Sequence, residues 1–576
     1  MFIKKLSFAT SLIPLIALFY AGTAPSYAIA GDKFENRLPE DEITYFLLPD
    51  RFENGDKAND NGGLIGDRLI TGFDPTSKGF YHGGDVKGLM NRLDYIKGLG
   101  ATAIWVAPIF KNKPVQGPKG DESAGYHGYW ITDFTTIDPH YGTEAEYKQL
   151  IEKAHNMGLK VYMDIVTNHS ADIIQYKECV DKPCPYRNTN DFPKKGYTAF
   201  IPKGEENAKT PAWTNDPQYY NNRGNSEWWG ESTIKGDFSG LDDFDTSNPR
   251  VISGFIDIYG TWIDKYKIDG FRIDTFKHVD SVFWQKFIPA IKARAAKNGI
   301  KNFHIFGEVA FDNPSVGTLA LYTRRDKAPA VLDFSFQGTV FGVVGKNEPT
   351  DNFTLLFDSD VLYQGGYKSA LTNQTFISNH DMGRLGMMLR KSLPNASNEE
   401  LLARVKLANA MLMMLRGSPT IYSGDEQGFT GHGNDQAARE DMFPSKVASY
   451  NDNILLGTNA TTADNNFNPS HPLYQQLKML AQIRQSNVAL KRGKQIIRKT
   501  QNGPGIFAVS RVDDLGNEIV VAFNTSDKPI NENVKTNFKN KNWNDLINNG
   551  ANTSDANAIL QINLEPFGYA IYRAVK

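Results

Sequence analysis

Three acidic residues lie where short apolar runs of the chain end. They are Asp274 in GFRIDTFKH, Glu308 in FHIFGEV and Asp381 in TFISNHD. Any one of them alone could cap a helix or form a surface salt bridge. Paired carboxyl groups, however, are what glycoside hydrolysis needs, because one attacks the sugar or holds water while the other, with a raised pKa, protonates the leaving oxygen.

Two opposite charges interrupt the apolar run that leads to Asp274. Arg272 and Asp274 are two residues apart, and on a strand such side chains point to the same face. A buried charge is costly unless it is paired or used. We therefore expect Arg272 to keep Asp274 ionised and oriented, as a nucleophile requires. Lys277 and His278, which follow, could by themselves be the exposed first turn of a helix.

The elements that must position these residues are apolar runs separated by helical or loop-rich sequence. Eight such runs begin at Ile43, Ala101, Leu159, Asp269, Phe303, Ala330, Thr375 and Ser418. Their alternation with helices predicts an α/β fold, a (β/α)8 TIM barrel. Chemistry in such barrels collects at the C-terminal ends of the strands, so we expect the three acidic residues to meet there together with His169 and His380.

Two segments depart from this alternation. Residues 170–245 are rich in Asn, Pro, Gly, Lys and aromatic residues, which predicts a loop-rich subdomain inserted after the third strand. Beyond residue 492, strands alternate around a turn at 513–516, which predicts a C-terminal antiparallel β-sandwich domain. The expected organisation is a signal peptide at 1–30, barrel parts at 31–169 and 246–492, the insert at 170–245 and the β domain at 493–576.

The N-terminus has the pattern of a secretory signal peptide. Lys4 and Lys5 precede an apolar stretch, and residues 28–30 read Ala-Ile-Ala, the small-x-small form that signal peptidase cuts. A membrane anchor is the alternative, but the stretch is shorter than the ~20 residues of a span and contains Pro14. We expect a protein secreted to the periplasm or the medium, without a membrane span after cleavage.

Composition and cysteine usage narrow the possible partners. The chain carries 63 basic and 65 acidic residues, with a net charge of −2. This balance, without basic runs, argues against nucleic acid or an anionic membrane as a partner, and we expect a monomer. Cys179 and Cys184 are the two cysteines. In an oxidising compartment they predict a local disulfide rather than a metal site or a catalytic thiol.

Together these motifs resemble those of the α-amylase family of glycoside hydrolases. GFRIDTFKH, DIVTNH, GEV and FISNHD occur in the family's order, ATAIWVAPIF and YHGYW also match, and the resemblance runs from about Glu42 to the C-terminus. It implies a retaining enzyme in which Asp274 is the nucleophile, Glu308 the general acid and then base, and Asp381 the carboxylate that binds and distorts the sugar. A retaining mechanism also implies that the first two carboxyls lie roughly 5 to 5.5 Å apart.

The resemblance also implies roles for the residues around the carboxylates. His169 and His380 would hydrogen-bond hydroxyls of the sugar at the scissile bond, Tyr126 in YHGYW would stack beneath it, and Arg272 would orient the nucleophile. Lys277 and His278 match a pair on the leaving-group side in family members that act on α-1,4 bonds. Trp228 and Trp229 in the insert could be sugar platforms or core residues.

The leading interpretation is an α-amylase that cleaves α-1,4 bonds inside starch, glycogen or maltodextrins. One alternative is a cyclodextrin glucanotransferase, although segment 493–576 has room for one β domain and such enzymes usually carry more. A maltogenic, cyclodextrin-degrading or debranching activity also stays open. An inactive carbohydrate-binding relative is a further alternative, but such relatives typically lose the three acidic residues that this chain has.

Two calcium sites are expected. The loop DRFENGDKANDNGG and the later YHGGD supply hard oxygen ligands that suit Ca²⁺, although Asx-rich turns can be purely structural. The candidates, matching the calcium loop of cyclodextrin glucanotransferases, are Asn54, Asp56, Asn59, Asp60, Gly83 and Asp85. A second family site would join barrel and insert through Asn168, Asp243 and the backbone carbonyl of His278. Because GLDDFD departs from the family pattern, Asp242 and Asp245 remain alternatives to Asp243.

Overall fold

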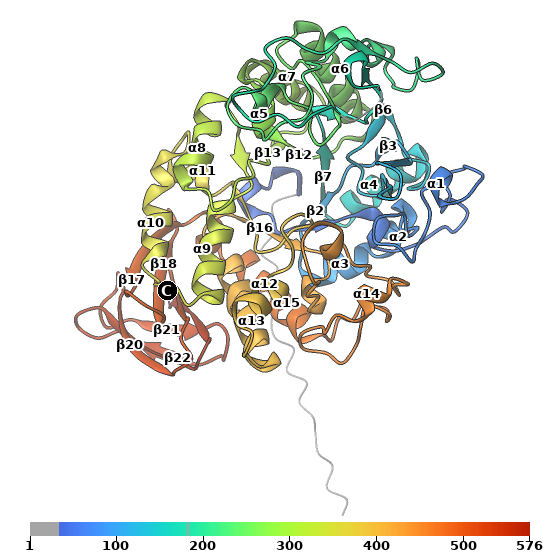
Figure 1. Ribbon diagram of the computed structural model, residues 1–576. Helices are drawn as coiled ribbons and strands as arrows, with labels where there is room; N and C mark the ends of the chain where they lie inside the picture. Colours follow the sequence, from blue (N-terminus) through green and yellow to red (C-terminus); the bar gives the residue numbers. More distant parts are fainter. Residues whose placement is uncertain (1–33, 181–183, 576) are drawn as a thin grey trace, which may run out of the picture.

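The computed structural model of the chain describes residues 34–180 and 184–575. The predicted signal peptide, 1–30, lies outside these residues. Figure 1 shows a barrel ringed by helices, with the insert at one end of the view and a C-terminal β domain on one flank. Among the described residues, no helix combines the length and apolar character that a membrane crossing requires.

The central sheet confirms the predicted barrel. Eight parallel strands pair in the order β14-β13-β12-β7-β2-β1-β16-β15, and a single bridge between Leu332 and Gln374 links the two ends. All eight overlap the predicted apolar runs, although β15 shares only Thr375 with the run predicted to begin there. Their bounds are β1 Thr44–Leu47, β2 Ala103–Val106, β7 Lys160–Ile165, β12 Gly270–Ile273, β13 His304–Gly307, β14 Ala330–Val331, β15 Gln374–Thr375 and β16 Ser418–Tyr422.

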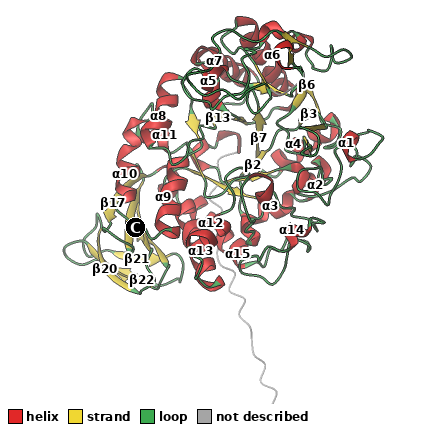
Figure 2. Cartoon of the chain, in the orientation of Figure 1, coloured by secondary structure: helices red, strands yellow, loops and turns green. Residues whose placement is uncertain are grey.

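Helices surround the barrel, as Figure 2 shows in red. The N-terminus of α4 is fixed by a capping box in which Thr143 and Glu146 bond each other's backbone N–H. The longer helices are α4 Glu144–Asn156, α6 Pro249–Tyr266, α7 Ser281–Lys297, α8 Val316–Arg325, α9 Phe334–Gly345, α12 Leu385–Ser392, α13 Asn398–Met414 and α15 Pro472–Gln485. The shorter ones are α1 Arg68–Thr71, α2 Val86–Asn91, α3 Leu93–Leu99, α5 Ser232–Lys235, α10 Asn352–Asp358, α11 Tyr367–Ala370, α14 Ala448–Asn451 and α16 Val488–Arg492.

Short strand pairs build the loops over the C-terminal ends of the barrel strands. In the loop after β2, β3 Phe110–Asn112 pairs with β6 Ile131–Ile137, and β4 Val115–Gln116 with β5 Ser123–Ala124. Between β7 and α6, β8 His169–Ser170 pairs with β11 Asp242–Asp243, and β9 Gln175–Tyr176 with β10 Ala199–Phe200. This last region also contains the predicted disulfide, Cys179–Cys184, with Cα atoms 5.1 Å apart.

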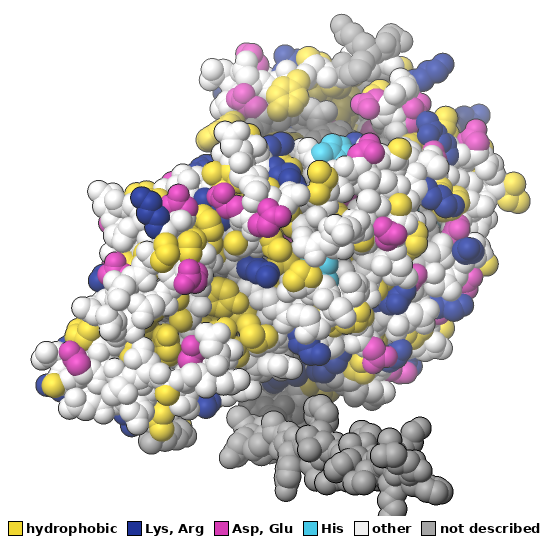
Figure 3. Space-filling view, turned by 90° about the horizontal axis from the view of Figure 1, so that it is seen from below, with side chains coloured by type: hydrophobic (Ala, Val, Ile, Leu, Met, Phe, Trp, Pro, Cys, Tyr) yellow, Lys and Arg dark blue, Asp and Glu magenta, His cyan; other side chains and the backbone are white. Residues whose placement is uncertain are grey.

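The C-terminal domain is antiparallel, as predicted. One sheet contains β17 Lys494–Lys499, β18 Ile506–Val512, β19 Glu518–Asn524, β24 Tyr569–Ala574, β21 Asn542–Asp545 and β22 Ala551–Thr553, and a second contains β20 Ile530–Lys535 and β23 Ile559–Leu564. Side chains alternate along β18, so that Phe507 joins the main core shared with the barrel while Ala508 joins the small core between the two sheets. On the face shown in Figure 3, basic and acidic side chains are interspersed.

Candidate active site

Arg272 is the centre of a buried cluster of carboxylates. It lies on β12 with 1% of its surface exposed. Its Nη1 donates to Asp274 Oδ1 at 2.8 Å and to Asp164 Oδ1 at 2.9 Å, while its Nη2 lies 3.0 Å from Glu308 Oε2. One guanidinium therefore holds the predicted nucleophile, Asp274, and the predicted general acid, Glu308, on its two terminal nitrogens. The expected separation of 5 to 5.5 Å remains a prediction.

Strand register explains why these side chains meet. In the parallel pair β12–β13, Ile273 lies opposite Gly307, so the next residues, Asp274 and Glu308, leave the barrel side by side. In the pair β12–β7, Arg272 lies opposite Asp164. The chain then turns sharply at Thr275, whose left-handed φ of 49° is rare for a residue with a side chain. This turn lets the Thr275 N–H donate to Glu308 Oε2 at 3.0 Å.

The cluster holds more acid than base, which affects its protonation. Burial raises the pKa of Asp274 well above its ordinary value, the Arg272 charge opposes this, and the charges of Glu308 and Asp164 add to it. Burial likewise raises the pKa of Asp164 to about 6, against the opposing effect of Arg272. Asp164 accepts hydrogen bonds from Trp105 at 2.9 Å and Tyr129 at 3.1 Å. The cluster can thus retain a proton at a pH where exposed carboxyls are ionised.

Asp381 occupies a more open position, as a binding group at the mouth would. Its side chain is 47% exposed, compared with 11% for Asp274 and for Glu308. Arg439, in the loop after β16, donates to Asp381 Oδ1 at 3.1 Å and to the backbone oxygen of His380 at 3.1 Å. Asp435 pairs with the same guanidinium at 2.5 Å. This arginine fixes the segment that presents the third carboxylate.

The structure corrects the expectation for Tyr126. Its ring is fully buried, the Arg51 guanidinium covers one face at 3.9 Å, and its hydroxyl accepts a hydrogen bond from Arg439 at 3.2 Å. A ring held in this way cannot stack on a sugar. Tyr129, three residues later and only half-buried, instead contacts the cluster through its hydroxyl, which lies 3.0 Å from His380 Nε2.

The predicted histidines are buried and neutral. Burial lowers the pKa of His169 to about 4 and that of His380 well below its ordinary value. Within the described part of the chain, His169 Nε2 and His380 Nδ1 have no hydrogen-bond partner. The His169 ring stacks on Phe238, with centroids 5.4 Å apart. Neutral imidazoles of this kind suit hydrogen bonding to hydroxyl groups rather than proton transfer.

Lys277 and His278 lie on the first turn after β12, in different surroundings. Lys277 Nζ donates to the backbone oxygen of Ala310 at 2.5 Å and lies 4.3 Å from the Phe311 ring centroid. His278 is 4% exposed and its Nδ1 is bonded to the backbone oxygen of Thr233 at 2.7 Å. Their role toward a leaving sugar stays a prediction. In the insert, Trp228 stacks on Phe238, and Trp229 is 68% exposed.

The predicted N-terminal calcium loop is drawn together around Asp85. Asp85 caps α2 and accepts hydrogen bonds from the backbone of Gly55 and Asp56 and from Asn59 Nδ2 at 3.2 Å. Asn54 Nδ2 donates to Asp60 Oδ1 at 2.8 Å. The amide oxygens of Asn54 and Asn59 are buried without a partner among the described residues.

The backbone of Gly83 closes this loop. Gly83 has a left-handed φ of 96°, and a Cβ there would lie 2.5 Å from Asn54 Nδ2. Asp56 points elsewhere, to Lys87 at 3.1 Å. Among the described residues no three His, Cys, Asp or Glu side chains group closely enough for a metal. Any ion here would therefore need amide and backbone oxygens in addition to carboxylates, and such oxygens suit Ca²⁺.

Two members of the second predicted metal set have side-chain oxygens that contacts among the described residues leave unused. Asn168 Oδ1 and Asp243 Oδ1 are buried and lack partners within the described chain. Asp242, one alternative to Asp243, is already occupied, since it forms an ion pair with Lys209 and accepts from the backbone of Ile173 and Ile174. Asp245, the other alternative, accepts hydrogen bonds from Ser247. The geometry favours Asp243.

Three residues at the site were not found from sequence. Asp164 had a signal, because an acidic residue inside the apolar run LKVYMDIV must be paired. Tyr129 lies in the same YHGYW motif as Tyr126, so its type was visible but its direction was not. Arg439 lies in a loop far along the chain and carries no local motif.

These features define a (β/α)8-barrel protein with a buried carboxylate pair at the strand ends. The catalytic-domain model of the alpha-amylase family matches residues 46–498. An alpha-amylase of Streptomyces lividans is 46% identical over 491 residues, 80% of this chain and 53% of its own length. The chain therefore belongs to the alpha-amylase family. It spans about half the length of that relative.

Solved structures agree with this assignment. An Anoxybacillus alpha-amylase superposes with a TM-score of 0.69 at 26% identity, covering 94% of this chain and 99% of that one. A cyclomaltodextrin glucanotransferase described as the first with a three-domain ABC distribution superposes with a TM-score of 0.73 at 26% identity, covering 93% and 99%.

Proposed function

We propose that this protein is a secreted α-amylase that hydrolyses α-1,4-glucosidic bonds within starch, glycogen or maltodextrins, with retention of configuration. The observation that carries the proposal is that one buried arginine, Arg272, holds both Asp274 and Glu308 at the ends of two adjacent strands. The 46% identity to the Streptomyces alpha-amylase supports the substrate class.

The proposed reaction divides the work between the two carboxyls. Asp274, ionised and held by Arg272, attacks the anomeric carbon while protonated Glu308 gives its proton to the leaving oxygen. Glu308 then removes a proton from water, which hydrolyses the glycosyl-enzyme ester and restores both groups. Asp381, held by Arg439, binds hydroxyls of the same sugar, and the neutral imidazoles of His169 and His380 supply further hydrogen bonds.

In this proposal Tyr129, and not Tyr126, stacks beneath the sugar at the scissile bond. The Tyr129 ring lies beside the His380 ring, with centroids 5.7 Å apart and an interplanar angle of 16°. Lys277 and His278 are proposed to contact the leaving sugar and to favour α-1,4 bonds. Lys277 is the better placed of the two, because it is half-buried beside the exposed Phe311.

Transglycosylation is a second candidate, and one comparison favours it. The short C-terminal region was an argument against a glucanotransferase. However, 99% of a solved three-domain glucanotransferase superposes on this chain. The N-terminal Asx loop points the same way. A hydrolase and a glucanotransferase share the first chemical step and differ in the acceptor, so they are separated by their products.

We further propose two calcium sites. The first would use Asn54, Asn59, Asp60 and Asp85 with the backbone of Gly83. Asp56 supports the loop through Lys87 instead of pointing inward, although its backbone stays in reach. The second would use Asn168, Asp243 and the backbone oxygen of His278. When bound, Ca²⁺ would supply positive charge that links loops to the barrel, with no direct part in bond cleavage.

Secretion is part of the proposal because the N-terminal pattern and the disulfide both suit an oxidising compartment. We also propose that the protein is a monomer. The partner is an α-glucan, bound at the open ends of the barrel strands.

Proton NMR of the first products tests the proposal. Incubation with maltoheptaose should release reducing ends in the α configuration, and chromatography should show linear fragments from starch. First-formed β products would contradict a retaining mechanism. Cyclic products from starch would favour the glucanotransferase.

A further inference from the structure

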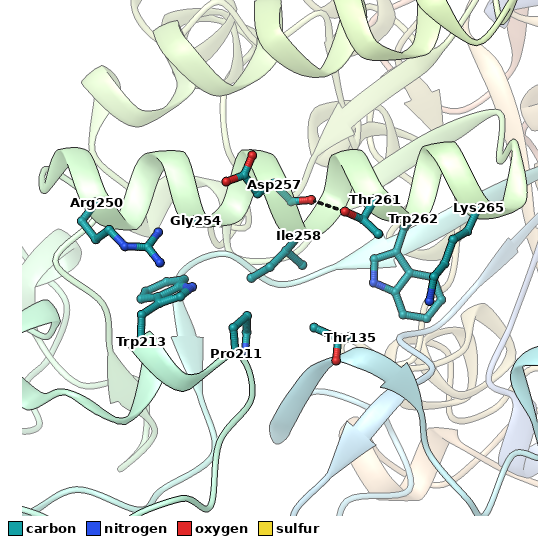
Figure 4. A pocket seen from close by; sticks show the side chains of 10 residues that line it. All are labelled: Thr135, Pro211, Trp213, Arg250, Gly254, Asp257, Ile258, Thr261, Trp262 and Lys265. Atoms are coloured by element: carbon teal, nitrogen blue, oxygen red, sulfur yellow. Dashed lines mark hydrogen bonds between the residues drawn. The ribbon is translucent and has the colours of Figure 1, made fainter.

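A pocket outside the carboxylate cluster lies between α6 and the insert. It has a volume of about 300 Å³, at the lower end of the roughly 300–1,000 Å³ range of ligand pockets. Figure 4 shows α6 along one side, Pro211 and Trp213 of the insert opposite, and Thr135 on the adjoining strand β6. No residue of the carboxylate cluster lines it.

The floor of this pocket is apolar and aromatic. Ile258 and Trp262 on α6 are buried, and Trp262 is fixed by a hydrogen bond from its Nε1 to the backbone oxygen of Phe134 at 2.8 Å. Trp213 is half-buried and fits closely against the helix at Gly254, where a Cβ would lie 2.5 Å from its Cζ2. The absence of a side chain at Gly254 is thus what lets the indole lie against α6.

The rim of the pocket carries polar groups that can still form hydrogen bonds with a ligand. Arg250 extends over the Trp213 ring, with its guanidinium carbon 5.0 Å from the centroid. Within the described residues, neither the Arg250 guanidinium nor the Asp257 carboxylate makes a hydrogen bond. The hydroxyl of Thr261 donates to the Asp257 backbone oxygen at 2.8 Å and can still accept.

The charges around the pocket balance, which indicates the kind of ligand. Arg250 is opposed by Asp257 on the same helix, and Lys265 is paired with Glu144 at 3.3 Å. A charged ligand would meet both signs at the rim. A neutral ligand with one apolar face and many hydroxyls matches the apolar floor and the donors and acceptors around it.

We propose that this pocket is a second α-glucan-binding site, which holds a short segment of the polymer while the carboxylate cluster acts elsewhere on it. The proposal rests on the α-glucan function proposed above. The Trp213 indole and Ile258 would contact the apolar face of the sugar, and Arg250, Asp257 and Thr261 would bond its hydroxyls.

Calorimetry with maltoheptaose on the Asp274→Asn protein tests this site. We expect two independent binding sites, and one after the further substitution Trp213→Ala. Because Trp213→Ala removes a packed ring and could disturb folding, a double variant at two exposed residues, Arg250→Ala with Asp257→Ala, is the second test. We expect it to lower the affinity of one site at least tenfold. Tyr186→Ala, which removes an exposed aromatic ring of the insert that does not line this pocket, is the matched control and should keep both sites.

A single site in Asp274→Asn would overturn the proposal, as would two unchanged sites in folded Trp213→Ala and in the Arg250/Asp257 pair. The proposed function fails on a different readout, namely starch hydrolysis at the wild-type rate by Asp274→Asn. When the pocket substitutions are made in the wild-type protein, with Asp274 present, each variant should keep the wild-type kcat on a short maltotrioside, because the pocket lies outside the carboxylate cluster.

Discussion

At the scale of single residues, one arginine accounts for most of the site. The spacing of Arg272 and Asp274 was enough to predict that they share a face, because strand geometry fixes side-chain direction. Spacing could not show that Arg272 also reaches Glu308 and Asp164. In YHGYW, both tyrosines were candidates, and the loop path that buries Tyr126 under Arg51 depends on contacts distant in sequence.

Arg439 gives a test of positioning at this scale. Arg439→Gln should lower kcat on maltoheptaose by about 10- to 100-fold, since a displaced binding group misaligns the sugar. Arg439→Lys should restore little, because an ammonium lacks the planar fork that bonds Asp381 and the His380 backbone together. Steady-state kinetics with thermal melting as a folding check would measure this, and wild-type kcat in folded Arg439→Gln would contradict it.

The acid limit of activity should follow the ionisation of Asp274. Its pKa is raised by burial and further by the nearby Glu308 charge, and the nucleophile works only when ionised, so activity falls as pH drops through that pKa. Removing the Glu308 charge should lower the pKa and move the acid limb to lower pH. Fluoride release from α-maltosyl fluoride by Glu308→Gln measures this, because fluoride leaves without an acid. A limb that stays in place or moves to higher pH would refute the coupling.

At the scale of elements, the barrel strands could be predicted because each is a continuous apolar run, as strands buried on both faces must be. The α4 helix could be predicted because its capping box is local. The insert could be recognised only by composition, since its short strand pairs depend on partners far along the chain, such as His169 with Asp243.

Calcium is the prediction that belongs to these loops. A chelator should lower the melting temperature, and Ca²⁺ at 100 times its Kd should return about 2.7 kcal/mol of stability for one site. Asp243→Asn should reduce the chelator effect by removing the ligand between barrel and insert, whereas Asp245→Asn, at the alternative position, should not. An unchanged melting temperature on chelation would remove the metal proposal.

At the scale of the whole molecule, the C-terminal domain is not an independent appendage. Phe507 on β18 stacks on Phe353 of α10 with centroids 4.2 Å apart, and both belong to the core that contains the barrel. The alternating pattern of this region predicted an antiparallel β domain, but which face of β18 meets the barrel depends on the partner helix. That information was absent from the local sequence.

Phe507→Ala should destabilise the whole chain by about 3–5 kcal/mol, because it opens a cavity at a fully buried ring. Unfolding should remain a single calorimetric transition at a lower temperature. Leu515→Ala, at a side chain 88% exposed in the same domain, should change stability by roughly 0.5 kcal/mol or less. Separate transitions for barrel and β domain would contradict a shared core.

The central claim is that Asp274, held by Arg272, is the nucleophile of an α-glucan hydrolase. The most direct measurement is the rate of starch hydrolysis by Asp274→Asn, an isosteric change that removes the attacking charge. We predict a loss of activity of about 10⁴-fold or more with unchanged folding, while maltoheptaose still binds. Hydrolysis by Asp274→Asn at the wild-type rate would contradict the account.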